Sequence, residues 1–232
     1  MSRVAVLQSN YIPWKGYFDL IGMVDTFIFY DDLQFTKNDW RNRNRIKTPN
    51  GTKWLSIPCG INTNRLICEV ELTDAKWQQS HWSIIYQSYG KAPYFKYYED
   101  FVREIYLNVK WKSLSDLNQS IIRKISTDLL GFNTIFEDSR QYALEGQKAE
   151  RLKHLLLLAG ATNYLSGPAA QNYLDEKLFM DAGINVEWMD YNGYPEYDQL
   201  YPPFEHGVSI LDLLFHTGPR ARYYLKSNPE MI

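Results

Sequence analysis

The chain has 232 residues, of which 45% are hydrophobic and 22% charged, and its net charge is −2. This composition is that of a globular domain and excludes disordered, collagen-like and coiled-coil chains. The slightly acidic balance excludes a bulk basic surface for nucleic acid, and no apolar run is long enough to span a bilayer. Two cysteines without a Cys/His array or a preceding secretory signal predict a reduced, cytoplasmic protein with no metal site.

The first thirty residues predict a strand, a helix and a second strand. A short apolar run over 3–8 is followed by apolar residues at helical spacing over 16–24 and by a β-rich run over 26–30. Strand, helix and strand in this order form the unit from which parallel sheets are built. We therefore expect an α/β domain.

The rest of the chain divides into a helical middle and an alternating last third. Strands are predicted over 54–58 and 67–72, as a hairpin or flap, before helices over 74–89, 94–107 and 114–130. Helices are then predicted over 147–159, 173–182 and 208–216, with strands over 163–165 and 185–189. The sequence predicts a single α/β domain over 1–232 that contains a helical insertion at 74–131.

The loop after the first strand is rich in polar and aromatic residues. In open α/β sheets, ligands bind where strands lead into helices. Lys15 and the free amides at Gly16 would face a bound anion, and Gln8 is a polar residue at the end of an apolar strand. The residues expected to bind the ligand are therefore Gln8, Tyr11, Trp14, Lys15 and Gly16. The alternative is structural, with Pro13 beginning a helix on which the aromatic rings pack.

Three residues are candidates for acid–base catalysis. Asp31 and Asp32 end the second strand at the same edge, where a carboxylate accepts a proton, binds Mg²⁺ or binds ribose hydroxyls. Neighbouring side chains of a strand point to opposite faces, so one of the two is expected in the site. His81 is the third candidate, although its place on a helical face with Trp77 and Ile85 also fits a core histidine. For the aspartates the alternative is a solvated turn.

A cluster of arginines follows these aspartates. In an extended segment, Arg41, Arg43 and Arg45 would share one face, and guanidinium groups bind phosphates and carboxylates. In a slightly acidic chain, such a cluster indicates a site for a small polyanion. The alternative is a solvated loop in which the arginines pair with nearby aspartates.

A second strand-to-helix junction lies in the last third. Ser166 and Gly167 follow the strand at 163–165 and would contact a ligand at the same sheet edge. A simple turn is the alternative, because Gly-Pro is common in turns.

Several of these segments together resemble the WbqC-like protein family. The matching segments are 8–18, 31–32, 43–46, 54–58, 160–167, 173–175 and 209–215, so the resemblance extends over about 4–219. The chain departs from the family at Ser9, where a proline is usual. Because members often accompany genes for O-antigen and other surface glycans, the resemblance implies a role with modified sugars or their carriers, without naming a reaction.

The opening segment also resembles the adenylylating nucleotidyltransferases that include pantothenate synthetase. This resemblance implies a parallel, nucleotidyltransferase-like (Rossmann-type) sheet. Those enzymes carry an HxGH motif at the first helix, whereas residues 14–17 here read Trp-Lys-Gly-Tyr and lack both histidines. The difference argues against adenylylation and leaves Lys15 as the residue that would hold a phosphate.

These observations predict an enzyme of surface-glycan biosynthesis that N-acylates or aminoacylates an amino sugar carried on a nucleotide. The nucleotide sugar is the expected partner, and the cofactor is an unidentified nucleotide or acyl donor. No nucleic-acid partner and no membrane span are expected, and a homodimer is an open alternative. Two other functions stay open: a nucleotidyltransferase that makes an activated sugar, and a non-catalytic module that binds a glycan or its carrier.

Overall fold

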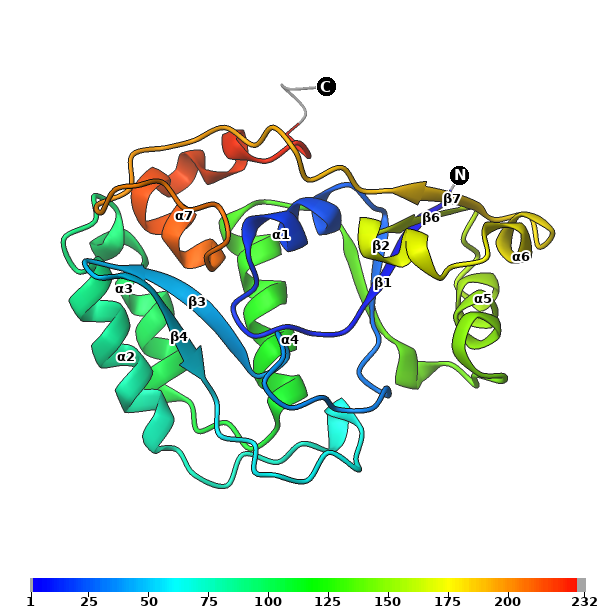
Figure 1. Cartoon of the computed structure of the whole chain (residues 1–232), viewed down its shortest axis with the longest axis horizontal. Helices are drawn as coiled ribbons and strands as arrows, with labels where there is room; N and C mark the ends of the chain where they lie inside the picture. Colours follow the sequence, from blue (N-terminus) through cyan, green and yellow to red (C-terminus); the bar gives the residue numbers. More distant parts are fainter. Residues whose placement is uncertain (1, 229–232) are drawn as a thin grey trace.

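Five parallel strands form the central sheet of the computed structural model, which describes residues 2–228 (Figure 1). Their order is β5–β2–β1–β6–β7, and their bounds are Arg3–Leu7 for β1, Thr26–Phe29 for β2, Ile135–Asp138 for β5, Asn163–Ser166 for β6 and Asn185–Trp188 for β7. β1 pairs with β2 on one side and with β6 on the other. The order therefore reverses at β1, as in Rossmann-type sheets, and the predicted α/β class is confirmed.

Helices cover both faces of this sheet because its strands are apolar on both sides. Val4 and Val6 of β1 belong to a core with α5 (Lys148–Leu158) and α6 (Glu176–Met180). Ala5 points to the other face and belongs to a larger core formed with α1 (Lys15–Gly22), α4 (Leu114–Lys124) and α7 (Ile210–Thr217). Such two-sided burial is typical of parallel strands.

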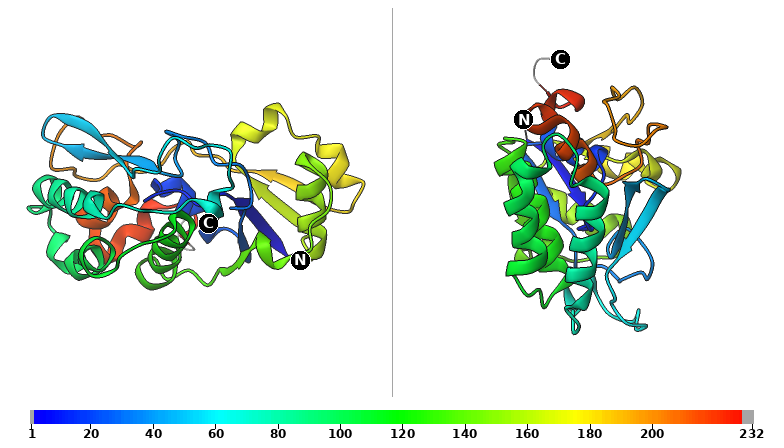
Figure 2. Two further views of the ribbon diagram at one scale, coloured as in Figure 1. Left: turned by 90° about the horizontal axis from the view of Figure 1, so that it is seen from below. Right: turned by 90° about the vertical axis from the view of Figure 1, so that its left-hand side faces the viewer.

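The long connection from β2 to β5 builds a second half of the molecule beside the sheet (Figure 2). It contains the antiparallel hairpin of β3 (Arg43–Thr48) and β4 (Gly51–Ser56), followed by α2 (Lys76–Tyr89), α3 (Phe95–Arg103) and α4. α3 and α4 each continue into a short π-helical stretch. None of the helices within residues 2–228 combines the length and the apolar character needed to cross a membrane.

The predicted hairpin is wrong in its pairing. β4 pairs with β3, with Arg45 opposite Trp54, whereas Ile67–Glu69 forms only a 3₁₀ turn. The alternating arginines and asparagines of β3 lack the apolar side chains that indicate a strand. The tight turn at Pro49 and Asn50, which leads into Gly51 with a φ of 96°, was the available signal. β5 was not predicted either.

Candidate functional site

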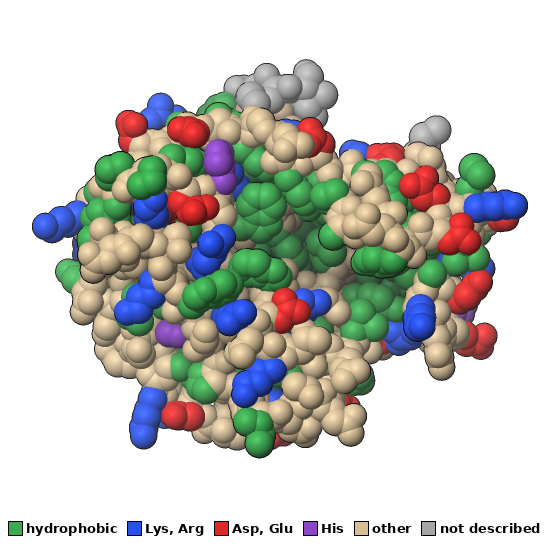
Figure 3. All heavy atoms as spheres, in the orientation of Figure 1, with side chains coloured by type: hydrophobic (Ala, Val, Ile, Leu, Met, Phe, Trp, Pro, Cys, Tyr) green, Lys and Arg blue, Asp and Glu red, His purple; other side chains and the backbone are tan. Residues whose placement is uncertain are grey.

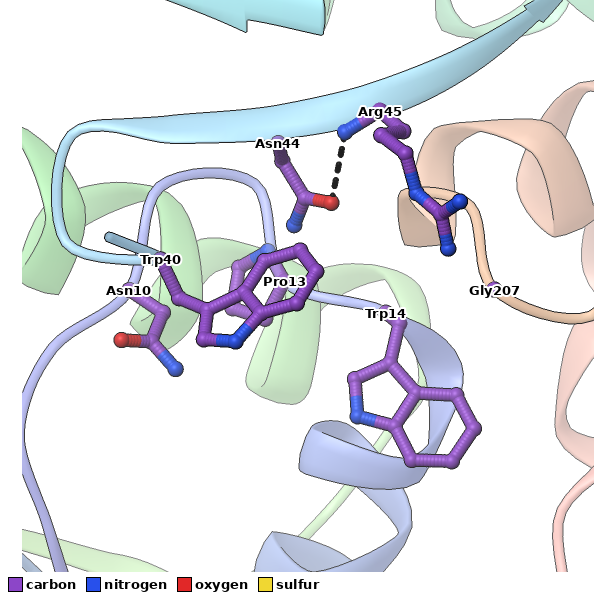
Figure 4. A pocket seen from close by; sticks show the side chains of 7 residues that line it. All are labelled: Asn10, Pro13, Trp14, Trp40, Asn44, Arg45 and Gly207. Carbon is purple, nitrogen blue, oxygen red and sulfur yellow. Dashed lines mark hydrogen bonds between the residues drawn. The ribbon is translucent and has the colours of Figure 1, made fainter. Parts of the chain in front are cut away.

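Two pockets lie next to each other at the carboxyl end of β1. The first, here called the hairpin pocket, has a volume of about 320 Å³ and is lined by Asn10, Pro13, Trp14, Trp40, Asn44, Arg45 and Gly207 (Figure 4). The second, here called the sheet-edge pocket, has a volume of about 290 Å³ and is lined by Val6, Leu7, Gln8, Tyr30, Leu33, Leu152, Tyr164, Ser166, Gly167, Ala169, Ala170, Tyr173 and Leu174. Figure 3 shows a hollow in the middle of the molecule with apolar side chains around it.

Trp40 and Arg45 line the hairpin pocket, and Arg43 and Trp54 lie next to them on the hairpin. The rings of Trp40 and Trp54 are 43% and 41% exposed, and their centroids lie 5.4 Å apart. The guanidinium of Arg43 lies 4.3 Å from the centre of the Trp54 ring, and that of Arg45 lies 5.7 Å from it. Exposed indoles beside cations are suited to stacking a planar ring or a sugar and binding an attached anion.

The two arginines of β3 carry charge that the protein itself does not neutralise. Arg41 pairs with Asp39, as the structural alternative expected. Throughout residues 2–228, in contrast, no carboxylate pairs with Arg43 or Arg45. Both side chains lie on one face of β3, a placement that is suited to a doubly charged anion.

The loop that lines the hairpin pocket is strained and is held in place by β3. Ile12 has a φ of 36°, in the left-handed region that a β-branched residue rarely adopts. The buried side-chain amide of Asn44 donates hydrogen bonds to the main-chain oxygens of Tyr11 at 3.1 Å and of Ile12 at 2.9 Å. Strain of this kind persists where the surroundings fix it, and it concentrates at functional sites.

The sheet-edge pocket brings together three residues that the sequence placed at one edge. Gln8 follows β1, and Ser166 and Gly167 lie at the end of β6, so both strand ends contribute to the same pocket. The main-chain oxygen of Gln8 accepts a hydrogen bond of 2.9 Å from Tyr17. Its side-chain amide has no hydrogen-bond partner among the described residues and is therefore available to a ligand.

Asp31 and Asp32 line neither pocket, and both carboxylates are already bound. Asp31 is fully buried and accepts hydrogen bonds from the Ser9 amide at 2.8 Å, from Gln119 at 3.0 Å and from the Ser115 hydroxyl. It thus fixes the loop after β1 to α4. Asp32 is paired with Arg151 and accepts a hydrogen bond from a serine hydroxyl.

Tyr11 and His81 lie inside the helical half rather than in a pocket. The Tyr11 hydroxyl lies 2.8 Å from Nδ1 of His81 and 2.6 Å from the hydroxyl of Tyr106, and both Tyr11 and His81 are buried. Burial lowers the pKa of His81 to about 4, so the ring is neutral near pH 7. The structure therefore does not bring Tyr11 into the pocket of Ser166, and His81 fits the core alternative.

Lys15 and Gly16 begin α1 and are both buried. The Lys15 ammonium lies 3.4 Å from the main-chain oxygen of Pro195 and 5.1 Å from the centre of the Tyr194 ring. Burial lowers its pKa to about 8, against the opposing effect of nearby carboxylates. A side chain at Gly16 would lie 2.3 Å from the Trp14 indole, so that indole, and not a ligand, occupies the space that the glycine leaves open.

Residues from the last third of the chain complete the site and were missed in the sequence. Gly207 closes the hairpin pocket beside Arg45, whose guanidinium lies 2.6 Å from where a Gly207 side chain would begin. Tyr191 connects the two pockets: its ring centre lies 5.1 Å from that of Trp14, and its hydroxyl lies 3.7 Å from where a Gly167 side chain would begin. Only the fold brings these distant residues together.

Further residues at the hairpin pocket had a local signal. Asn10 lies within the opening motif, and Trp40 and Asn44 lie within the arginine cluster. Their position between candidate residues was the clue. His206, next to Gly207, is half-exposed, lies 4.0 Å from Glu196 and has a pKa lowered by burial and by the charge of Lys15.

Comparison with known proteins gives one family. The model of the WbqC-like protein family matches residues 8–224 of the chain. The chain belongs to the WbqC-like protein family. It is 45% identical over 228 residues to the uncharacterized protein Rv1507c of Mycobacterium tuberculosis, which covers 97% of this chain and 98% of that protein. No solved structure matches the chain significantly.

Proposed function

We propose that this WbqC-like protein is a transferase of surface-glycan biosynthesis that N-acylates or aminoacylates an amino sugar carried on a nucleotide. The observation that carries the proposal is the hairpin pocket, which is lined by Trp14, Trp40 and Arg45 and flanked on β3 and β4 by Arg43 and Trp54. Neither arginine of β3 has a carboxylate partner among the described residues. A nucleotide sugar combines planar or ring-shaped groups with a diphosphate. Its rings thus match the indoles, and its diphosphate matches the guanidinium groups.

The size and position of the pockets support a substrate of this class. Each pocket has the order of volume that small-molecule sites have, about 300 Å³ and upward. Both lie at the carboxyl end of β1, where the strand order reverses and where open α/β sheets bind ligands. Two adjoining pockets can accept two reacting molecules. Membership of the WbqC-like family supports the link to surface glycans.

His206 supports the catalytic part of the proposal better than the aspartates do. An attacking amine must lose a proton, and a neutral histidine accepts one. His206 directly precedes Gly207 of the hairpin pocket, is accessible and has a pKa below its ordinary value. Asp31, by contrast, has no exposed surface.

A second candidate is a non-catalytic module that binds the same nucleotide sugar. The observation that favours it is the engagement of both carboxylates, because Asp31 and Asp32 are held by hydrogen bonds and an ion pair rather than free for catalysis. The two candidates share the ligand and differ only in turnover.

Calorimetry with UDP and with a UDP-linked amino sugar tests the binding step. Replacement of Arg43 or Arg45 by alanine should weaken binding at least about tenfold, since a charge-assisted hydrogen bond contributes roughly 1.5–3 kcal/mol. Lysine should restore little, because the planar fork is lost. The control is Arg220→Ala, which changes an exposed arginine outside both pockets. Unchanged affinity in both alanine variants would remove the hairpin pocket from the binding site.

Mass spectrometry then separates the transferase from the binding module. The wild-type chain is incubated with the UDP-linked amino sugar and with acyl or aminoacyl donors, and the product is examined for an added acyl mass. His206→Gln should retain binding and lose most of the turnover. Binding without any product would leave the non-catalytic module as the function.

A further inference from the structure

We propose that the sheet-edge pocket binds the uncharged, apolar acyl group of a thioester donor, which makes the reaction an acylation and not an aminoacylation. This inference rests on the proposed function, because it names the second substrate of the same site. It concerns a different pocket from the one that binds the nucleotide sugar, so the two can be tested separately.

Most of the lining of the sheet-edge pocket is apolar. Its polar side-chain groups are the amide of Gln8, the hydroxyl of Ser166 and the hydroxyls of three tyrosines. Gly167 adds only backbone, and the remaining lining residues are aliphatic. No charged side chain of the described chain lines it. A pocket of this composition recognises its ligand by burying apolar surface and by a small number of hydrogen bonds.

An aminoacyl group does not fit this wall. Its ammonium would enter an apolar pocket without a carboxylate to pair with, which is strongly unfavourable. The nearby carboxylate of Asp32 is already paired with Arg151. A phosphate fits no better, since Arg151 also donates to the Tyr30 hydroxyl at 3.0 Å and is committed to the protein.

One polar group in the pocket is suited to the carbonyl of an acyl donor. The Gln8 side-chain amide has no hydrogen-bond partner within residues 2–228, and an amide N–H donates to a carbonyl oxygen. Gln8 also lies two residues before Asn10, which lines the hairpin pocket. A carbonyl bound to Gln8 therefore lies at the boundary of the two pockets, where the amine of the sugar would approach.

Transfer of the acyl group needs no reactant other than the sugar amine and the thioester. The sugar nitrogen attacks the thioester carbonyl carbon, a C–N bond forms and the C–S bond breaks. The sulfur leaves as a thiol after it takes up the proton that the nitrogen loses. An amide and a free thiol are the products.

Direct binding of simple thioesters tests the pocket without relying on turnover. The probes are the acetyl, butanoyl and hexanoyl thioesters of N-acetylcysteamine, measured by calorimetry on the full chain. Each added methylene should tighten binding by up to about fourfold until the pocket is filled. Ala170→Phe should abolish this gain by filling the pocket, while Ala143→Phe, at an exposed alanine outside it, should not.

The outcomes separate this inference from the proposed function. Arg45→Ala should leave thioester binding unchanged while it weakens UDP binding. If the wild type binds no thioester, or if Ala170→Phe binds the hexanoyl probe as well as the wild type does, the inference is overturned even where UDP still binds. Preferred transfer of a glycyl group to the sugar would overturn it as well and would leave the proposed function intact. Thioester binding with no UDP binding would overturn the proposed function and keep the pocket assignment.

Discussion

The hydroxyl of Tyr11 lies 2.8 Å from Nδ1 of His81, and both side chains are buried in the helical half of the protein. This pair ties the loop after β1 to α2, because Tyr11 belongs to the loop and His81 to the helix. The hydroxyl contact is available to the neutral ring, and a charged ring would be buried without a carboxylate partner among the described residues.

Acidification should therefore destabilise the protein through His81. Burial lowers the pKa of this histidine from 6.5 to about 4, so between these values the unfolded chain binds more protons than the folded chain. Stability relative to His81→Gln should fall as the pH drops through this range, by up to about 1.4 kcal/mol per pH unit. Urea unfolding at a series of pH values measures this, with His154→Gln as the control. Parallel curves of stability against pH for wild type and His81→Gln would contradict the lowered pKa of His81.

Lys15 should produce a pH dependence of the same sign in the alkaline range. Its folded pKa is lowered to about 8 from 10.5, so the unfolded chain binds more protons between these values, and stability rises with pH. Relative to Lys15→Met, the wild type should gain up to about 1.4 kcal/mol per pH unit in this interval. Unfolding in urea is again the measurement, and Lys91→Met, at an exposed lysine, should show no such gain. If the stability difference between wild type and Lys15→Met does not change with pH, the ammonium is exposed to water in the folded protein.

Asn44→Ala should impair both stability and binding. The variant leaves the main-chain oxygens of Tyr11 and Ile12 without their donor, and we expect unfolding to become easier by about 1–3 kcal/mol. Release of the strained loop should also weaken UDP binding in the hairpin pocket. Denaturant unfolding and calorimetry on the same samples test this, with Asn62→Ala as an exposed control. Full affinity in the variant would show that Asn44 does not position the loop for binding.

Gln8→Ala should remove function and spare the fold. Its side chain bonds to no other described residue, so the melting temperature should match that of the wild type, with a change in stability within about 0.5 kcal/mol. Turnover, or thioester binding, should be lost. Tyr17→Phe is the matched comparison, because it removes the hydrogen bond to the Gln8 main chain and should lower stability by about 1 kcal/mol. A melting temperature of Gln8→Ala well below that of the wild type would show that the residue has a structural role.

Much of the sheet could be predicted because its signal is local. β1, α1 and β2 follow from hydrophobic periodicity within thirty residues, and the convergence of Gln8 with Ser166 follows from the rule that parallel strands end at one edge. β3 escaped prediction because its pattern of arginine and asparagine is set by the pocket it faces and by Trp54 on the neighbouring strand. Local propensity carries no such information.

The site was harder to predict than the sheet because contacts decide which polar residues are free. Sequence cannot tell that Asp31 is enclosed by Ser9, Ser115 and Gln119, since two of these partners belong to a helix more than eighty residues away. For the same reason Tyr191 gives no sign in the sequence of its contact with Trp14. In the structure the two aspartates lie outside both pockets, whereas Trp14, Trp40 and Arg45 line the hairpin pocket.

The short distance between Gln8 and Asn10 along the chain has a consequence for how the reaction would run. Each residue lines a different pocket, and two residues of extended backbone span at most about 7 Å. Two small molecules held by these side chains are thus confined to one reaction volume, with an effective concentration far above any that free solution provides. In the proposed reaction, transfer between them would need neither a carrier arm nor a covalent intermediate on the protein.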